Sequence, residues 1–240
     1  MKFEWSLNKR GRNNDDKHSK KEKKSKKAKT SDGLDLASLL GGADIETDAN
    51  HIYFYGEVTI ENCLELNRKI IQLNRDLKKW SIDYNSAPPK IYLHIYSNGG
   101  DLFAGFSSVD TIKNSEIPIV SIIEGSAASA ATLMSVVASE RYMTRNAFML
   151  IHELRSGVNG KFSDIDEEMK NCEVLMDKIY RIYEEHTKLS EKKLKKLLKK
   201  DLWWDLDICI KYKLVDGCWP DDHHQYKAVS SEVDNDDNEE

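Results

Sequence analysis

The sequence lacks any hydrophobic run long enough to cross a membrane. Its longest stretch without a charged residue, Gly125 to Ser139, has 15 residues with mostly small side chains, whereas a membrane-spanning helix needs about 20 apolar residues. The first residues, MKFEWSLNKRGRNND, also lack the apolar segment of a secretion signal. We therefore expect a cytoplasmic protein that makes no membrane contact, and we expect a buried helix in place of a membrane span.

Cysteine is scarce, and its spacing forms no metal-binding or redox motif. The four cysteines stand at positions 63, 172, 209 and 218 without a CxxC pair, which argues against a zinc ribbon and against a short disulfide framework. We expect four reduced thiols that pack as small apolar side chains. We also expect no metal site and no cofactor in this chain.

Charge is distributed unevenly along the chain. The 36 Lys+Arg and 41 Asp+Glu residues give a net charge of −5, yet Lys17 to Lys29 reads KHSKKEKKSKKAK and the chain finishes in SEVDNDDNEE. Such runs are typical of solvated, disordered segments. We divide the chain into a Lys-rich tail (1–33), one globular domain (34–220) and an acidic tail (221–240). No aromatic residue interrupts the lysine run, so nucleic-acid binding is not favoured.

Within the domain, β-rich segments alternate with helical periodicity. We expect strands at 51–58, 90–97 and 117–125 and further strands within RYMTRNAFMLIH; we expect helices at 60–80, at 102–115, directly after residue 125, at 164–186 and from about residue 190. Strands that alternate with helices pair in parallel through right-handed crossovers, which indicates an α/β fold. Functional groups in such folds gather at the carboxyl ends of the strands.

Two of the predicted strand ends carry unusual residues, and parallel pairing would bring them together. Ser129 lies among small residues at a strand-to-helix junction, where a serine can act as a nucleophile and the next backbone N–H can bind an oxyanion. A helix cap is the structural alternative, because the GxSxG motif of the hydrolase elbow is absent. Gly99-Gly100 follows another strand and lets backbone N–H groups face a ligand, although a simple hairpin turn would also use this dipeptide. Gly100 and Ala130 are the candidate oxyanion donors.

A base and an acid would complete this chemistry. Of the seven histidines, His152 is the best placed because it ends the apolar strand AFMLIH. A carboxylate on the far imidazole nitrogen would fix the tautomer of such a base. The candidates for this acid are Asp201, Asp205, Asp207 and Asp216.

These residues resemble the proteolytic subunit of the caseinolytic (Clp) protease, a self-compartmentalising serine peptidase. The family segment INSPGGSVTAG is similar to residues 95–105, the nucleophile motif GQAASMGA to residues 125–131, and the histidine motif MIHQP to residues 150–154. The family's GLVD resembles residues 213–216, and counting back from it places the family's aspartate on Asp201. The resemblance covers roughly residues 50–218. It implies a triad of Ser129, His152 and Asp201, with activity that rises through about pH 6–7.

The resemblance also implies an architecture and partners. The fold would be ClpP/crotonase-like, with repeated strand–strand–helix units, a handle strand at 156–164 and a long helix. Subunits would form a heptameric ring that cleaves unfolded polypeptides, and two rings would stack through their handles. A separate ATP-driven AAA+ unfoldase would deliver the substrate, because this chain lacks a GxxxxGK[ST] loop. An extended substrate would pair beside Gly100–Leu102 and the segment after His152. Its binding residues would be Asp101, Leu102, Leu154 and Arg155.

Several departures limit what the resemblance carries to this chain. Leu202 stands where the family commonly has arginines that make ring-to-ring ion pairs, and the amino-terminal axial loop of the family is not recognisable. The resemblance therefore does not establish ring stacking or the docking of a standard unfoldase. A capsid maturation protease of the same fold and a catalytically silent ring subunit are the alternative functions. Enoyl-CoA hydratase relatives share the fold but do not use a serine–histidine–aspartate set.

Overall fold

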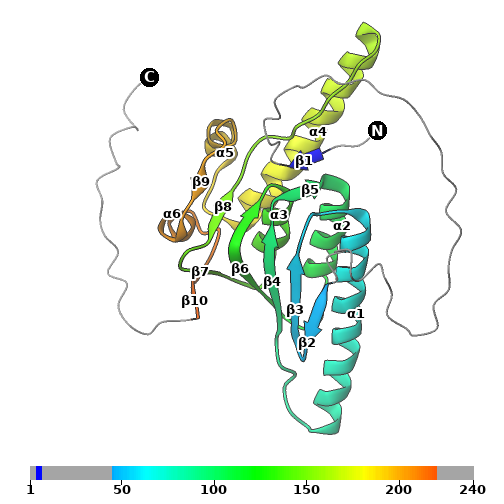
Figure 1. The fold of residues 1–240 in the computed structure, drawn as a ribbon, viewed down its shortest axis with the longest axis vertical. Helices are drawn as coiled ribbons and strands as arrows, with labels where there is room; N and C mark the ends of the chain where they lie inside the picture. The colour runs from blue at the N-terminus through cyan, green and yellow to red at the C-terminus, as the bar shows by residue number, and fades with distance from the viewer. Residues whose placement is uncertain (1–3, 7–44, 221–240) are drawn as a thin grey trace, which may run out of the picture.

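The structure is a computed structural model that describes residues 4–6 and 45–220. Its strands alternate with helices along the chain, which confirms the predicted α/β class (Figure 1). The strands are β1 (Glu4–Ser6), β2 (Glu46–Asp48), β3 (His51–Tyr55), β4 (Ile91–Ser97), β5 (Gly99–Asp101), β6 (Ile119–Ala128), β7 (Glu140–Thr144), β8 (Phe148–Leu150), β9 (Trp203–Trp204) and β10 (Gly217–Trp219). The helices are α1 (Ile60–Asp83), α2 (Leu102–Lys113), α3 (Ala130–Val136), α4 (Phe162–His186), α5 (Glu191–Leu197) and α6 (Leu206–Lys211).

The main sheet has the strand order β10-β7-β6-β4-β3-β2, and β8 and β9 extend it beside β6. Neighbouring strands from β3 to β10 along this path are parallel, while β2 pairs antiparallel with β3. β8 continues the parallel set next to β6, and β9 is antiparallel to β8. The carboxyl ends of β4, β6 and β8 therefore point the same way.

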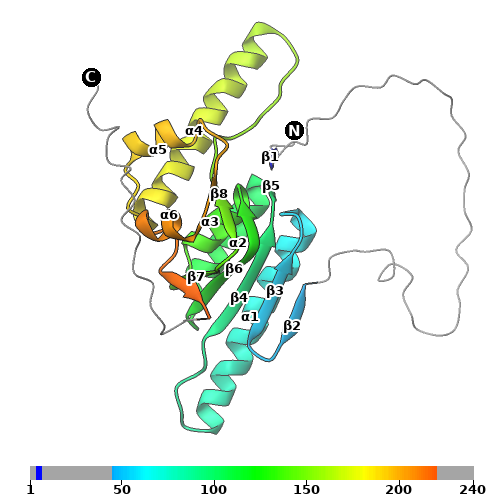
Figure 2. The ribbon, with the colours of Figure 1, turned by 60° about the vertical axis from the view of Figure 1, so that its left-hand side comes forward.

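One face of the sheet is buried beneath helices. Side chains alternate along a strand, and in β3 Ile52 and Phe54 are buried whereas Tyr55 is exposed. α1 contacts α2, α2 contacts α3, and α3 contacts α4, so these helices form a continuous layer (Figures 1 and 2). The predicted packing of the basic helix is confirmed, because Leu194 and Leu198 are buried in the core while the α5 lysines stay exposed.

The predicted handle differs from the structure in one respect. The long helix α4 projects beyond the body of the domain, and the chain runs out along it after β8 (Figure 1). Residues 151–160, however, contain no strand. The last three residues of the predicted handle strand at 156–164 belong to α4, and the six before them form no strand, so the handle strand is not formed.

The amino-terminal tail also departs from the prediction. Residues 4–6 form the strand β1, which pairs with β5, so the predicted disorder is wrong for these three residues. The remainder of the two predicted tails, together with residues 34–44 of the predicted domain, lies outside the described residues. All four cysteines are free thiols. None of the helices within residues 45–220 is long and apolar enough to cross a membrane.

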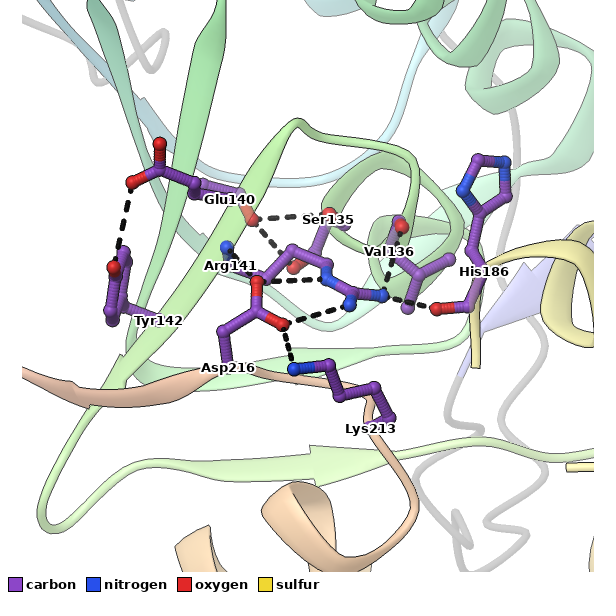
Figure 3. Close-up of polar contacts among 9 residues, drawn as sticks. Ser135, Val136, Glu140, Arg141, Tyr142, His186, Lys213 and Asp216 are labelled. Carbon is purple, nitrogen blue, oxygen red and sulfur yellow. Dashed lines mark hydrogen bonds and ion pairs between the residues drawn. The ribbon is translucent and has the colours of Figure 1, made fainter. Parts of the chain in front are cut away.

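A partly buried ion pair fastens the last strand to the sheet (Figure 3). Arg141 of β7 donates to the Asp216 carboxylate from its backbone N–H at 2.9 Å and from Nη2 at 2.9 Å, and Lys213 Nζ lies 2.8 Å from the same carboxylate. The guanidinium also donates to the backbone carbonyl of His186 at the end of α4. This cluster therefore joins β7, the approach to β10 and α4.

Burial raises the pKa of Asp216, but hydrogen bonds from Arg141 and Lys213 lower it more, so the pKa lies below its ordinary value. A carboxylate with a lowered folded pKa stabilises the protein above its unfolded pKa of about 3.9. That stabilisation is lost as the pH falls through the folded pKa. The contribution of Asp216 is therefore complete at neutral pH.

We predict that Asp216→Asn lowers the free energy of unfolding at pH 7 by about 3 kcal/mol, because it leaves the Arg141 charge buried without its carboxylate. Urea denaturation measures this loss, which should shrink as the pH falls below about 3.9. The control is Glu116→Gln, which breaks the exposed pair with Lys78 and should cost less than about 1 kcal/mol. Equal losses for the two variants would contradict the assigned role of the cluster.

Candidate active site

The carboxyl ends of β4, β6 and β8 meet at one edge of the sheet. Ser97 in β4 is the register partner of Ala127 in β6, and Ala128 in β6 is the partner of Leu150 in β8. The two strand ends singled out in the sequence, residues 97–101 and 124–130, are therefore neighbours. The segment that begins at Ile151 emerges beside them. The expected clustering at one sheet edge is confirmed.

Ser129 occupies a strained turn between β6 and α3. Its φ of 59° and ψ of −129° lie in a region that costs a residue other than glycine about 1–3 kcal/mol. Its backbone N–H donates to the Leu150 carbonyl at 2.9 Å, and its carbonyl accepts from Thr132 Oγ1 at 2.6 Å. Thr132 is in turn 2.5 Å from the Tyr183 hydroxyl of α4. Ser129 is a helix N-cap by position, but its side chain makes no capping hydrogen bond.

The two candidate oxyanion donors come from different elements, Ala130 directly after Ser129 and Gly100 in β5. Ala130 is the first residue of α3, and a first-turn N–H has no partner within its own helix. Gly100 is enclosed by Val58, whose N–H donates to the Gly99 carbonyl at 2.9 Å and whose carbonyl accepts from Asp101 N–H at 2.7 Å. Backbone groups of successive strand residues point to opposite edges, so Gly100 N–H faces away from Val58.

Only glycine fits at position 100. Its φ is +151°, and a Cβ there would lie 2.3 Å from the Val58 carbonyl oxygen. The turn after β4 is therefore built for close approach of two backbones, which explains the glycine pair that the sequence places there. The simple hairpin alternative is not formed, because β4 continues through β5 into a helix and does not return antiparallel.

The free edge of β5 carries β1. β1 pairs antiparallel with β5, and the register places Trp5 opposite Gly100. This is the edge toward which Gly100 N–H points, and it is the edge where an extended substrate was expected to add as a strand. In the structure, a segment of the chain itself takes that position.

His152 lies two residues after β8 and is buried, with 1% of its surface exposed. Its Nδ1 is 2.7 Å from the carbonyl oxygen of Glu153, so Nδ1 carries the proton in the neutral ring and Nε2 is the basic nitrogen. Burial lowers the pKa of His152, the Glu153 carbonyl raises it, the Arg155 cation lowers it and the Asp201 carboxylate raises it. The net effect is a pKa below the ordinary value, which favours the neutral form that a general base needs.

The four candidate acids occupy distinct environments. Asp205 caps α6 and accepts from Ile208 N–H at 3.0 Å, and Asp216 belongs to the Arg141 cluster. Asp207 is exposed on α6. Asp201 lies between α5 and β9, and it is the one of the four whose charge acts on His152. Its carboxylate forms an ion pair with the Arg155 guanidinium.

The predicted substrate-binding residues are mostly engaged in the fold. The Asp101 side chain caps α2 by accepting from Ala104 N–H at 2.8 Å. Leu102 is fully buried, so its side chain belongs to the core. Leu154 packs against the core, and its backbone N–H donates to Met176 Sδ at 3.2 Å. Arg155, predicted to bind substrate, forms an ion pair with Asp201.

A chain of polar aromatic residues on the open sheet face was also missed. His51 Nδ1 is 2.9 Å from His94 Nε2, and His94 Nδ1 is 2.9 Å from Glu124 Oε1. Tyr55 donates to the other oxygen of Glu124. The alternation of HIYFY and IYLHIY places these side chains on one face, which was the available signal. No three His, Cys, Asp or Glu side chains within the described residues are grouped to hold a metal ion.

We predict that the imidazole of His152 titrates below its ordinary pKa of about 6.5, because burial disfavours the charged ring. Proton NMR of the histidine Cε1–H resonances against pH measures this value, and the signal lost in His152→Asn identifies the residue. The sequence alone suggested a transition through about pH 6–7, so the structure moves the expected midpoint downward. A midpoint above about 6.5 would contradict this account.

Comparisons with known proteins agree with this geometry. A family model described as Clp protease matches residues 57–221, which is more than half of the chain. The ATP-dependent Clp protease proteolytic subunit 2 of Treponema denticola is 35% identical over 132 residues, which cover 54% of this chain and 66% of that protein. Subunit 1 of Chlamydia muridarum is 27% identical over 174 residues, which cover 71% of this chain and 86% of that protein.

The chain thus spans slightly less than two thirds of the Treponema relative that it matches. Among solved structures, a variant of ClpP1 from Listeria monocytogenes has a TM-score of 0.61 at 22% identity, and the match covers 71% of this chain and 91% of that chain. This likeness confirms the predicted fold. The relatives are named as Clp proteolytic subunits, so the capsid maturation alternative is not favoured. The extent of the family match and the shared fold show that the chain belongs to the Clp protease family.

Proposed function

We propose that the protein is a serine endopeptidase subunit in which Ser129 is the nucleophile, His152 the general base and Asp201 the acid of the triad. The observation that carries this proposal is the strained turn at Ser129, held by a backbone bond to Leu150 two residues before His152. Strain of this kind persists only where the surrounding structure enforces it, and it is concentrated at functional sites. Membership of the Clp protease family supports a peptidase.

The reaction is acyl transfer. Ser129 Oγ attacks the peptide carbonyl while His152 Nε2 takes the hydroxyl proton, and the proton then passes to the leaving amine. Water hydrolyses the acyl-enzyme by the reverse sequence. Negative charge on the carbonyl oxygen is stabilised by the N–H groups of Gly100 and Ala130. Glu153 already fixes the tautomer of His152 through Nδ1, so the role left to Asp201 is electrostatic stabilisation of the imidazolium.

The assembly and partners follow from the family and stay proposals for this chain. We propose a heptameric ring that encloses the sites and admits unfolded polypeptides. A separate AAA+ unfoldase would use ATP to deliver them, and this chain would need no cofactor of its own. The projecting α4 and the segment that runs along it after β8 offer surface for contacts between rings (Figure 1). The cytoplasmic location also stays a prediction.

We predict that a fluorophosphonate probe labels Ser129 and that Ser129→Ala abolishes both labelling and peptide cleavage, a loss of several powers of ten. Peptide mapping by mass spectrometry identifies the labelled residue. The matched control is Ser126→Ala, which removes a hydroxyl three residues earlier on β6 and should keep most of the activity. Cleavage by Ser129→Ala at the parent rate would show that the nucleophile lies elsewhere. Complete absence of labelling in the assembled parent would favour a silent ring subunit.

A further inference from the structure

Two charged side chains compete around the base. Arg155 follows His152 by three residues, and its Nη2 forms an ion pair with Oδ2 of Asp201. The imidazole meanwhile uses Nδ1 to contact the Glu153 carbonyl at 2.7 Å. The structure therefore holds the acid against the arginine and the base against a backbone carbonyl.

The backbones that carry these groups are fixed to each other. Glu153 N–H donates to the Leu198 carbonyl at 2.9 Å, which ties the segment after β8 to the end of α5, three residues before Asp201. Leu198 itself is buried. The Asp201 charge acts on His152 from this position, so we expect a change of partner to need rotation of the side chains, with the imidazole leaving the Glu153 carbonyl, and no movement of the strands.

We propose that Arg155 is a positioning residue that holds the Asp201 carboxylate away from the His152 imidazole, so that the triad closes when Arg155 is drawn to another anion. This inference rests on the proposed function. The charged groups that act on His152 are Arg155 and Asp201, with opposite effects. The guanidinium of Arg155 can donate two hydrogen bonds to the Asp201 carboxylate, whereas the His152 imidazole can donate only one. Without a bound substrate, Asp201 therefore pairs with Arg155 in preference to His152.

The competition is weak enough to be reversible. The side chains of Arg155 and Asp201 are 37% and 47% exposed. Exposed ion pairs shift an equilibrium by no more than about fivefold, and salt weakens them further. Arg155 therefore modulates the activity and does not abolish it.

The test compares Arg155→Gln with Arg181→Gln, which removes the same charge from a distant position on α4. We expect kcat for a short fluorogenic peptide to rise about two- to fivefold in Arg155→Gln, with KM little changed. The rising limb of kcat against pH should also move to higher pH, because loss of the cation raises the pKa of His152. Arg181→Gln should change neither quantity, and Arg155→Lys should stay close to the parent.

The dependence of kcat on ionic strength provides a second measurement. Raising ionic strength should accelerate the parent, because it weakens the ion pair, and should leave Arg155→Gln unaffected. An unchanged or lower kcat in Arg155→Gln, together with an unchanged pH profile, would overturn the proposal. Fluorophosphonate labelling of Ser129 separates this result from failure of the proposed function. If Ser129 of the parent is labelled and Arg155→Gln changes neither kcat nor the pH profile, only the positioning role of Arg155 is removed.

A different observation carries a second inference. Trp5 of β1 stands opposite Gly100, on the edge toward which the candidate oxyanion N–H points. Ser129 and His152 are 0% and 1% exposed, so the nucleophile and base are closed to solvent in this arrangement. We infer that residues 4–6 of the same chain occupy the strand position of a substrate and hold the full-length protein in a self-inhibited state. This inference also rests on the proposed function.

The inhibitory contact is suited to displacement. A strand of three residues has little stability on its own, and the antiparallel backbone bonds that hold it are those an extended polypeptide would offer in its place. The alternation set by Val58 directs both the N–H and the carbonyl of Gly100 toward Trp5. Proline at position 5 would remove the N–H that pairs with the Gly100 carbonyl.

The test compares Trp5→Pro with Trp5→Phe, which keeps the backbone pairing, and with a chain that lacks residues 1–8. We expect Trp5→Pro and the truncated chain to react with a fluorophosphonate probe at least about tenfold faster than the parent, because the competent fraction rises, while Trp5→Phe matches the parent. A synthetic peptide of residues 1–8 should slow the truncated chain competitively. Equal labelling rates for all four proteins would overturn the inference, and a parent rate that depends on protein concentration would show that the segment comes from a second copy.

Discussion

The hydrogen bond of 2.9 Å from Ser129 N–H to the Leu150 carbonyl is the contact on which the candidate site depends. It extends the parallel pairing of β6 and β8 by one residue beyond Ala128. The chain must nevertheless enter α3 at once, so Ser129 adopts a positive φ to satisfy both demands. The same bond fixes the distance along β8 at which His152 emerges. Ser129 and His152, the proposed nucleophile and base, are therefore positioned by backbone pairing.

Backbone positioning explains which substitutions the turn tolerates. The proposed oxyanion donors are the backbone N–H groups of Gly100 and Ala130, so we expect side-chain identity at neighbouring positions such as Asn98 to be secondary. Gly100 is the exception, because Val58 encloses it and a Cβ would lie 2.3 Å from the Val58 carbonyl. The sheet core that holds these segments is apolar, and the Arg141 cluster is the main charged contact that closes its far end.

Much of the fold was readable from the sequence because its signals are local. Alternation in HIYFY and IYLHIY and the helical spacing in residues 164–186 reflect faces that pack on one core. The predicted handle strand at 156–164 was wrong because its last three residues begin α4, and the backbone before them bonds elsewhere, as Glu153 N–H does to the Leu198 carbonyl. β1 was missed for the converse reason. Its pairing with β5 joins residues more than ninety positions apart, and three residues beside a Lys-rich run carry no periodicity.

The candidate site was predictable where one strand end carries one unusual residue, as at Ser129 and His152. Choosing among four aspartates was not possible, because each choice depends on side-chain partners: Asp205 caps a helix and Asp216 binds Arg141. The Leu102 side chain packs in the core, which the sequence did not indicate, and the pairing of a substrate strand beside its backbone stays a prediction. The sequence predicted which strand ends carry the candidate residues, whereas the partners of their side chains depend on tertiary packing.

The site combines a rigid centre with weakly held surroundings. Ser129 and His152 are fixed by strand pairing and burial, whereas Asp201 is held by an exposed ion pair and the substrate edge by a strand of three residues. The strain at Ser129 costs about 1–3 kcal/mol and persists because the surrounding core enforces it. The outer contacts are each worth little, so a substrate strand or a competing anion can replace them. The proposed regulation at this edge therefore needs no change in the core that holds Ser129.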